Sequence, residues 1–408
     1  MPTTTPRTPD PAAAPAASLA RCVGDVEEFL TDGFTRRPHR HHGGSFDDLL
    51  SLADVDAQLA GAGLRRPVVR VVRGGEVIDP STWTRGARTG AVRVDDLVHP
   101  GRVLDLFGDG ATIVLQSLQR WWPPVAGFCR DLEAVLGHAV QANAYLTPPD
   151  AEGLTPHHDT HDVFVLQVHG SKQWTVREPL VVDPLQRQRS DHAAAAEQRE
   201  LFTVELRPGD CMYLPRGFIH SAATQSGTSL HLTIGVLART VHDVLGRLVD
   251  LAAKQPQFRR TLPAGGGGVP QRQLLKELLT ELSGWLDTLP AELDDDGVTA
   301  LLSTLGRRPP ALDGQLLDLA SLGSLDDTTV LVARRAGVEV TTIDDLLRLD
   351  LGDRHLELPA VLRPALDLLL DGAPHPVSDL TQLLDGPSRA VLARRLVREG
   401  VLRTVDGP

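Results

Sequence analysis

The stretch from about residue 19 to 240 alternates short apolar runs with glycine and proline. Four of these runs are rich in Val, Ile, Leu and Thr and are bounded by turn sequences such as Gly-Ser, Pro-Gly-Asp and Ser-Gly: residues 66–78, 161–176, 202–215 and 229–237. This composition and punctuation are typical of β-strands. Helical patterns are interspersed early, as in VGDVEEFLTDGF and FDDLLSLADVDAQLAGAG. The pattern therefore predicts a β-barrel or β-sandwich with helices packed outside.

The pattern becomes helical from about residue 239 to 289. The segments TVHDVLGRLVDLAAK and QRQLLKELLTELSGWLDTL place apolar residues at i, i+3, i+4 and i+7, which is the spacing of an amphipathic helix. Between them, LPAGGGGVP at residues 262–270 has the composition of a flexible linker. The end of the chain runs helix, turn, helix, turn, helix, strand, an order similar to that of a winged-helix module.

Four regions follow from these patterns. They are a disordered tail rich in Pro, Ala and Thr (1–18), a β domain (19–240), a helical domain (241–300) and a winged-helix-like C-terminal domain (301–408). The tail lacks the basic segment and strongly apolar run of a signal peptide, and no apolar run reaches the ~20 residues of a membrane helix. These features predict a cytoplasmic protein.

Composition narrows the classes of partner. The chain of 408 residues has a formal net charge of −12, which argues against broad electrostatic binding to nucleic acid or anionic membranes. Cys22, Cys129 and Cys211 lie far apart, so neither a disulfide framework nor a thiolate zinc site is expected. Only three of the 41 Lys and Arg residues are lysines, so any single lysine raises a question.

A cluster of histidines and aspartates at residues 157–169 suggests a metal site. His157-x-Asp159 and His355-x-Glu357 are the two H-x-[D/E] triplets, about as many as the composition yields by chance, so context must decide between them. The first leads into a strand-like run, and residues i and i+2 of a strand face the same side, ~6.6 Å apart. His220, after a Pro-Gly-Asp turn and a tight bend, offers a third ligand. Two His and one carboxylate on one face suit Fe(II) and leave open positions.

The other histidines of this cluster fit the metal site less well. His158 is expected to face the opposite side of the strand, as a surface or supporting residue. His161 has the right parity but lies ~13 Å from His157 along an extended strand, too far to share one face of one ion without a bulge. His169 precedes a hairpin glycine and is expected to be exposed, and His355-x-Glu357 is interpreted as surface decoration.

The ordered run of these motifs resembles a known family. HHDTHDVFVLQVHGSKQW, PGDCMYLPRGFIHSA and SLHLTIGV together resemble the Jumonji C (JmjC) family, and most of all its cupin-like ribosomal-oxygenase branch of Fe(II)- and 2-oxoglutarate-dependent protein hydroxylases. The resemblance covers roughly residues 20–262. It implies an α+β chain with a double-stranded β-helix (jelly-roll, cupin) barrel and flanking helices, followed by a helical dimerisation segment and the winged-helix-like domain.

The resemblance also assigns roles to residues. His157, Asp159 and His220 would be the iron ligands, and Lys172 would grip the distal carboxylate of 2-oxoglutarate. The sequence around Lys172 is consistent with this role. A lysine that is flanked by strand-forming residues and projects into a barrel needs an anion as partner. Asn143 and Tyr145, which share parity on one strand, and His231 match positions that line the co-substrate pocket; a core role for His231 is almost as well supported.

The implied cofactors are Fe(II), 2-oxoglutarate and O₂. The expected reaction is hydroxylation of a protein or peptide side chain, with Arg or His of a ribosomal protein as the first candidate. Two alternatives stay open: a tailoring hydroxylase of a peptide or natural product, and a non-catalytic cupin-like regulator that binds DNA through Arg389, Arg394, Arg395 and Arg398. The charge of the chain disfavours nucleic acid as a partner, and the apolar stripe within residues 239–289 predicts a homodimer.

Overall fold

The computed structural model describes most of the chain between residues 14 and 405. The described residues are 14–405 without 62, 152–154, 225–226, 263–269, 294, 303–311, 335–337, 339 and 352–353. Most of the predicted linker at 262–270 thus lies outside them. The chain divides into two compact units, one formed by residues 1–237 with 307–408 and the other by residues 238–306.

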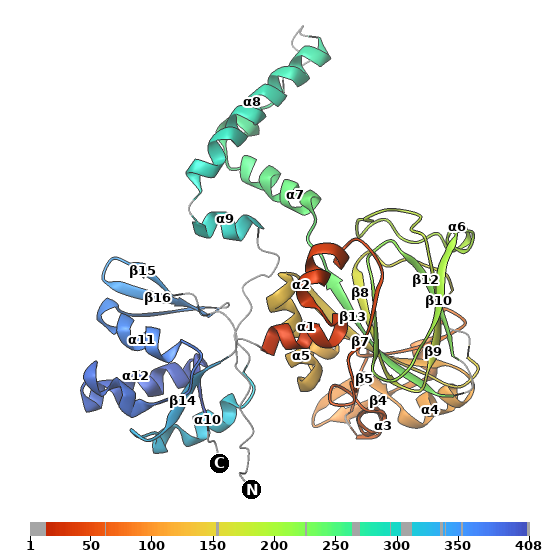
Figure 1. Ribbon diagram of the computed structural model, residues 1–408, viewed down its shortest axis with the longest axis horizontal. Coiled ribbons are helices and arrows are strands. Elements are labelled where there is room, and N and C mark those ends of the chain that lie inside the picture. The colour runs from red at the N-terminus through yellow and green to blue at the C-terminus, as the bar shows by residue number, and fades with distance from the viewer. Residues whose placement is uncertain are drawn as a thin grey trace. The chain divides into compact units, whose positions relative to one another are not determined.

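Two antiparallel sheets face each other and form the β domain (Figure 1). The larger sheet has the strand order β1 (His39–His42), β11 (Asp210–Leu214), β8 (Asp162–His169), β13 (Ser229–Leu237), β7 (Ala139–Thr147), β6 (Thr112–Leu115), β2 (Val69–Arg73) and β3 (Glu76–Val77). The smaller sheet has the order β10 (Glu200–Leu206), β9 (Lys172–Arg177) and β12 (Ile219–Thr224). A separate hairpin joins β4 (Thr84–Thr89) and β5 (Val92–Val98). This is the predicted cupin-like barrel.

Alternation along the central strands separates two apolar cores. In β8, Phe164 and Leu166 belong to the core on one face of the larger sheet. Val163 and Val165 face the other way and pack with Trp174 in a core between the sheets. Successive side chains of a strand point to opposite faces, so β8 is buried on both sides, which explains why its sequence is a continuous apolar run. The interior of the barrel is therefore lined by the odd-numbered residues of β8.

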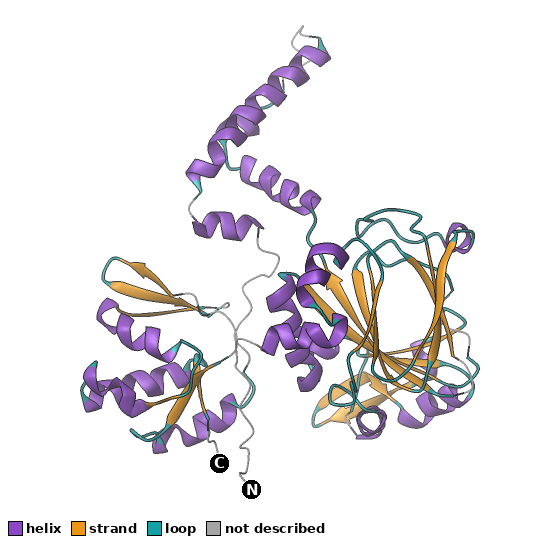
Figure 2. Ribbon diagram, in the orientation of Figure 1, coloured by secondary structure: helices purple, strands orange, loops and turns teal. Residues whose placement is uncertain are grey.

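Helices cover the outer face of the larger sheet (Figure 2). The helices of the β domain are α1 (Ala14–Val23), α2 (Val26–Glu28), α3 (Leu52–Gly61), α4 (Pro100–Gly108), α5 (Pro123–Leu136) and α6 (His192–Ala196), of which α6 lies beside the smaller sheet (Figure 1). Helix α1 packs against α5. The prediction of a disordered tail as far as residue 18 is wrong for residues 14–18, because burial of Leu19 and Cys22 extends the helix back to Ala14. Residues 1–13 of that tail lie outside the described residues.

The second unit is helical, as its periodicity predicts. It contains α7 (Val241–Ala252), α8 (Gln271–Glu292) and α9 (Asp295–Leu302). Its small core joins Ala252 to Trp285 and Leu289. Helix α7 begins with a capping box between Thr240 and Asp243, in which each side chain accepts a backbone N–H of the other residue. No helix among the described residues is long and apolar enough to span a membrane.

The C-terminal region follows the predicted order of helix, turn, helix, turn, helix and strand only from residue 363 onward, and there a two-residue strand lies between the first two helices. Its elements are α10 (Gln315–Ser321), β14 (Val330–Ala333), β15 (Val340–Ile343), β16 (Leu346–Asp350), β17 (His355–Pro359), α11 (Arg363–Leu369), β18 (His375–Pro376), a 3₁₀ helix (Val377–Gln382), α12 (Gly386–Arg398) and β19 (Leu402–Thr404). The second predicted helix is thus a 3₁₀ helix. Strands β18, β14 and β19 form one sheet, and β15, β16 and β17 form another.

Candidate metal centre and its pocket

Three side chains converge at one end of the barrel. One ligand atom from each of His157, Asp159 and His220 lies within 4.8 Å of the others. Nε2 of His220 is 3.6 Å from Oδ2 of Asp159, and the rings of His157 and His220 are 4.5 Å apart. The structure therefore brings together the three residues singled out in the sequence.

The backbone that positions this cluster differs from the expected strand. β8 begins only at Asp162, so His157 and Asp159 precede it. His157 instead forms an isolated bridge with His220, in which N–H of His157 donates to O of His220 (3.1 Å) and N–H of His220 donates to O of His157 (2.8 Å). The N–H of Gly217 donates to O of Asp159 (3.0 Å) and ties the same two segments together.

Both histidines are oriented by backbone carbonyl groups. Nδ1 of His157 lies 2.8 Å from O of Thr155, and Nδ1 of His220 lies 3.1 Å from O of Phe218. Because a carbonyl oxygen only accepts, Nδ1 carries the proton in each ring and Nε2 keeps its lone pair. Metal-binding histidines typically have this arrangement.

The protonation states also suit a metal. Burial, and then the neighbouring His157, lower the pKa of His220 to about 4, so its imidazole is neutral near pH 7. Burial opposes ionisation of Asp159, but the surrounding histidines outweigh it, His220 most of all, and hold the pKa of the carboxyl group below its usual range. Neutral imidazole and ionised carboxylate are the forms that bind a metal ion.

The neighbouring histidines have other contacts. His158 is buried, and its Nε2 lies 3.1 Å from O of Gln188, while its N–H donates to Oγ of Ser190 (3.1 Å). Segment 183–200, for which no role was predicted, thus contacts the loop that contains His157 and Asp159. His161 lies 3.3 Å from Nε2 of Gln141 and 3.4 Å from O of Asp162 through its two ring nitrogens.

Two further histidines of the sequence analysis lie apart from this cluster. His169 is exposed at the end of β8. His355 is exposed and pairs with Glu357 at 3.6 Å, as expected of two ordinary surface residues.

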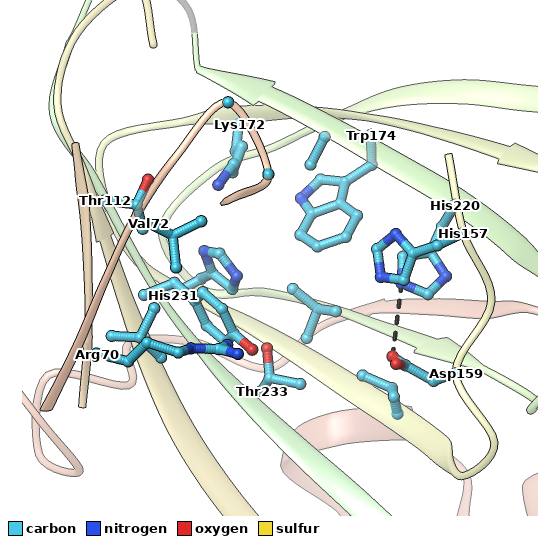
Figure 3. Close-up of a pocket in the computed structure, with 17 residues that line it drawn as sticks. Arg70, Val72, Thr112, His157, Asp159, Lys172, Trp174, His220, His231 and Thr233 are labelled. Atoms are coloured by element: carbon cyan, nitrogen blue, oxygen red, sulfur yellow. Dashed lines mark ion pairs between the residues drawn. The ribbon is translucent and has the colours of Figure 1, made fainter. Parts of the chain in front are cut away.

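A pocket of about 260 Å³ extends from the three-residue cluster into the barrel (Figure 3). It is lined by Val163 and Val165 of β8, by Lys172 and Trp174 of β9, and by residues of β2, β6, β7, β12 and β13. In Figure 3 the cluster lies at one side and Lys172 at the other, with Trp174 between them. The predicted metal ligands and the predicted carboxylate-binding lysine therefore face one cavity.

Lys172 is a buried cation with a neutral partner. Its side chain is 5% exposed, and its Nζ donates to Oγ1 of Thr147 at 3.2 Å. Among the described residues, no carboxylate forms an ion pair with it. Burial lowers the pKa of Lys172 to about 8. A buried ammonium group in this state is stabilised by an anion that enters the pocket.

Aromatic rings form the wall between the lysine and the cluster. His231 stacks on Tyr145 with centroids 5.0 Å apart, and Trp174 contacts the edge of His231 at 5.5 Å. Burial, and then the charge of Lys172, hold the pKa of His231 well below its usual range. Nδ1 of His231 and Nε1 of Trp174 are buried without a hydrogen-bond partner among the described residues. These unsatisfied groups can bind a polar ligand.

One predicted pocket residue lies elsewhere. Asn143 shares the face of β7 with Tyr145 but is absent from the described residues that line the pocket. Its Oδ1 accepts the N–H of Ser117 at 3.0 Å, and Ser117 has φ 58°, in the left-handed region. The carboxamide therefore stabilises a turn, which the parity argument could not foresee.

Arg70 is a pocket residue that was not predicted from the sequence. It lies on β2 and lines the pocket together with Val72, Thr112 and Thr233 (Figure 3). The alternation of VRVVR puts Arg70 and Val72 on one face of a strand. Nothing in the sequence of this strand shows which face is the interior, so the position of Arg70 was not predictable.

Comparisons with known proteins agree with the fold. Residues 119–244 match the family model of the JmjC domain. Over 242 residues, 56% of this chain, it is 33% identical to "Ribosomal oxygenase 1" of Homo sapiens. Over 224 residues it is 33% identical to "Ribosomal oxygenase 2" of Mus musculus. The matched parts cover 35% and 46% of those two proteins, so the chain spans less than half of each.

Solved structures show the same fold at lower identity. The crystal structure of Escherichia coli ribosomal oxygenase YcfD aligns with a TM-score of 0.53 and 18% identity, covering 94% of this chain and 99% of that one. A structure of YcfD in complex with cobalt and 2-oxoglutarate aligns with a TM-score of 0.51 and 19% identity, covering 93% of this chain and 98% of that one.

Proposed function

We propose that this chain, whose residues 119–244 form a JmjC domain, is an Fe(II)- and 2-oxoglutarate-dependent oxygenase that hydroxylates a side chain of a protein or peptide. One observation carries the proposal: a cluster of two histidines and one aspartate shares a single pocket with a buried lysine that has no anionic partner among the described residues. The similarity to proteins named ribosomal oxygenases points in the same direction.

The three-residue cluster fits Fe(II). His157, Asp159 and His220 would hold the metal through Nε2, a carboxylate oxygen and Nε2, and this donor set leaves positions open for other ligands. Thr155 and Phe218 fix the two imidazole rings through their carbonyl groups. The chain therefore keeps its ligands oriented before any metal arrives.

The opposite end of the pocket fits a dicarboxylate. Lys172 would neutralise one carboxylate of 2-oxoglutarate, while Thr147 orients the ammonium group. The unpartnered N–H of Trp174 adds a second donor on the same wall. Val163 and Val165 are buried and limit access of water to the cavity. When iron, 2-oxoglutarate and O₂ are bound, they supply the insertion of oxygen into a C–H bond; the chain binds, orients and shields them.

A ribosomal protein is the first candidate substrate, with Arg or His as the modified residue. The support is the name that the curated relatives share. A tailoring hydroxylase of a peptide or natural product is the alternative within the same chemistry. We also propose, from the sequence alone, that the protein acts in the cytoplasm.

A DNA-binding regulator is less well supported. The order of the C-terminal elements supports a winged-helix-like domain, and α12 would be the helix that reads DNA. However, Arg389 pairs with Asp327 (2.5 Å), Arg395 pairs with Glu399 (3.1 Å), and Arg394 donates to O of Leu325 (3.1 Å). These intramolecular contacts reduce the positive charge and donors that α12 offers to phosphates.

We further propose that the second unit makes a homodimer. Leu245 and Val249 of α7 are 55% and 67% exposed, four residues apart, and Leu275 and Leu279 of α8 are 56% and 55% exposed at the same spacing. Residues four apart share one helix face, so each helix presents an apolar stripe. A second copy of the chain would cover these stripes.

The decisive experiment combines turnover with substrate discovery. Protein loaded anaerobically with Fe(II) receives 2-oxoglutarate, O₂ and a cell lysate. We expect succinate to form and one set of peptides to gain an oxygen atom, and we expect Asp159→Ala to abolish both. If DNA binding falls steeply with salt while neither succinate nor oxygenated peptides appear, the regulator is the correct function instead.

A further inference from the structure

A second cation faces the pocket beside the aromatic wall. In the larger sheet, Arg70 pairs with Val114, Val114 with Tyr145, and Tyr145 with His231. Residues directly opposite in an antiparallel sheet point to the same face, so this row projects into the barrel. Burial raises the pKa of Tyr145, and the charge of the nearby Arg70 opposes this rise. Arg70 therefore lines the same cavity as the candidate metal ligands.

The guanidinium group of Arg70 has donors to spare. Its Nε is buried without a hydrogen-bond partner, and no carboxylate of the described residues forms an ion pair with it. A guanidinium group has five N–H donors in a planar fork that matches a carboxylate. An unpaired charge in a partly buried cavity is unfavourable unless a ligand of opposite charge binds. The free protein thus holds an incomplete anion site.

The co-substrate does not complete this site. Lys172 contacts the next inward-facing row, that of Thr112 and Thr147, ~6.6 Å along the strands from Arg70. In the proposed function, the charge of 2-oxoglutarate is shared between the metal and Lys172. With Asp159 as the carboxylate of the metal cluster, the occupied pocket still has an excess positive charge at Arg70. That charge is available to a further ligand.

Arg70 is also placed for contact with an incoming molecule. It is half-buried, whereas Lys172 is 5% exposed. The turn of Gly74 and Gly75 that follows its strand lines the same pocket. The charges of Arg70 and Asp159 both act on the Tyr145 hydroxyl group. A group held by Arg70 and Tyr145 would therefore lie near the metal ligands.

We infer that Arg70 is a specificity-determining residue that binds a carboxylate of the substrate, so that the preferred peptide carries Asp or Glu at or directly beside the modified residue. This inference rests on the proposed oxygenase function and refines its substrate class. A cationic arginine target would meet Arg70 as a like charge, whereas an acidic neighbour would form a bidentate pair with it. Tyr145 lies on the same inward-facing row and lines the pocket beside the guanidinium group.

The test uses matched variants and matched peptide pools. Arg70→Gln removes the charge and keeps hydrogen-bonding capacity, Arg70→Lys keeps the charge and loses the fork, and Arg70→Glu reverses the charge. Arg73→Gln on the same strand is the control, because Arg73 is exposed and its alternation points away from Arg70. Three randomised peptide pools differ only at one fixed position, which is Asp, Asn or Lys. Each protein is assayed for 2-oxoglutarate affinity without O₂ and for pool-stimulated succinate formation.

We expect the wild type and Arg73→Gln to prefer the Asp pool. Arg70→Gln should raise KM for that pool roughly ten- to a hundred-fold, as for loss of a hydrogen bond to a charged group. The KM of Arg70→Lys for the Asp pool should fall between those of the wild type and Arg70→Gln, and Arg70→Glu should favour the Lys pool. The 2-oxoglutarate affinity of all these variants should stay within about twofold of the wild-type value.

Three results overturn the inference. They are equal use of the Asp and Asn pools by the wild type, no stimulation by any pool in protein that binds 2-oxoglutarate, and a loss of 2-oxoglutarate affinity in Arg70→Gln, which would make Arg70 a co-substrate residue. Failure of the wild type itself to bind 2-oxoglutarate would instead overturn the oxygenase function, and this inference with it. The affinity measurement therefore separates the two failures.

Discussion

His157 and His220 are register partners: each donates its backbone N–H to the carbonyl group of the other, at 3.1 and 2.8 Å. This pair of bonds joins a loop before β8 to the start of β12, although 63 residues of sequence separate them. Their rings consequently lie 4.5 Å apart, with each Nδ1 bound to a carbonyl oxygen. These backbone bonds hold the two imidazole groups side by side.

Removal of any member of the cluster should abolish metal binding and turnover. We expect His157→Ala, Asp159→Ala and His220→Ala to be purified without stoichiometric Fe(II) after anaerobic loading and to form no succinate. His158→Ala and His169→Ala should keep Fe(II), because the first ring contacts segment 183–200 and the second is exposed. Metal analysis of all five variants decides the assignment, and full activity without Asp159 would refute it.

Lys172 should contribute to 2-oxoglutarate affinity without affecting the metal. Hydrogen bonds to charged groups contribute ~1.5–3 kcal/mol, so Lys172→Ala should weaken 2-oxoglutarate binding roughly ten- to a hundred-fold. Lys172→Arg should do less harm, although the planar fork fits poorly in a pocket shaped for an ammonium group. Lys276→Ala, at an exposed position, is the control. Titration of 2-oxoglutarate into anaerobic, Fe-loaded proteins gives the answer; equal affinities would remove Lys172 from the site.

Sequence reasoning predicted what depends on local pattern. The ordered motifs gave His157, Asp159, His220 and Lys172 as candidates, and the structure places them around one pocket. The same reasoning failed where a side chain can either line the pocket or bond to the backbone, as for Asn143, whose carboxamide oxygen accepts the backbone N–H of Ser117.

The sequence also could not show which face of β2 is interior, and so Arg70 was not predicted. Both errors concern tertiary contacts between strands that are distant in sequence, since β2 reaches the barrel only by pairing with β6. Periodicity within one segment contains no information about those partners.

Charge on the apolar stripe of α7 should separate the proposed dimer. We expect the wild type to have a dimer mass at micromolar concentration, and Leu245→Glu combined with Val249→Glu to give a monomer with unchanged helix content. Both positions are more than half exposed in the described chain, so their substitution should not disturb the core of the unit. Val182→Glu, at a position 75% exposed in the β domain, is the control. Light scattering after size exclusion provides the mass, and a monomeric wild type would refute the dimer.

The last prediction concerns the energetic cost of keeping Lys172 buried. Burial lowers its pKa from 10.5 to about 8, so the unfolded chain binds more protons than the folded protein between these values. The free energy of unfolding should therefore rise with pH from about 8 to 10.5, and below pH 8 the buried ammonium group should cost about 3 kcal/mol. Lys172→Met, which keeps the length of the side chain, should remove that cost.

We therefore expect Lys172→Met to be more stable than the wild type at pH 7 in the absence of ligand, and this advantage to shrink as the pH approaches 10.5. Urea unfolding at both ends of the range measures the difference. Lys254→Met, at an exposed position, should change stability by less than about 0.5 kcal/mol. Added 2-oxoglutarate with metal should narrow the difference, because the ligand stabilises the wild type, which binds it more tightly, by more than it stabilises the variant. A variant that is no more stable than the wild type at pH 7 would show that Lys172 is solvated, and would weaken the argument that it awaits an anion.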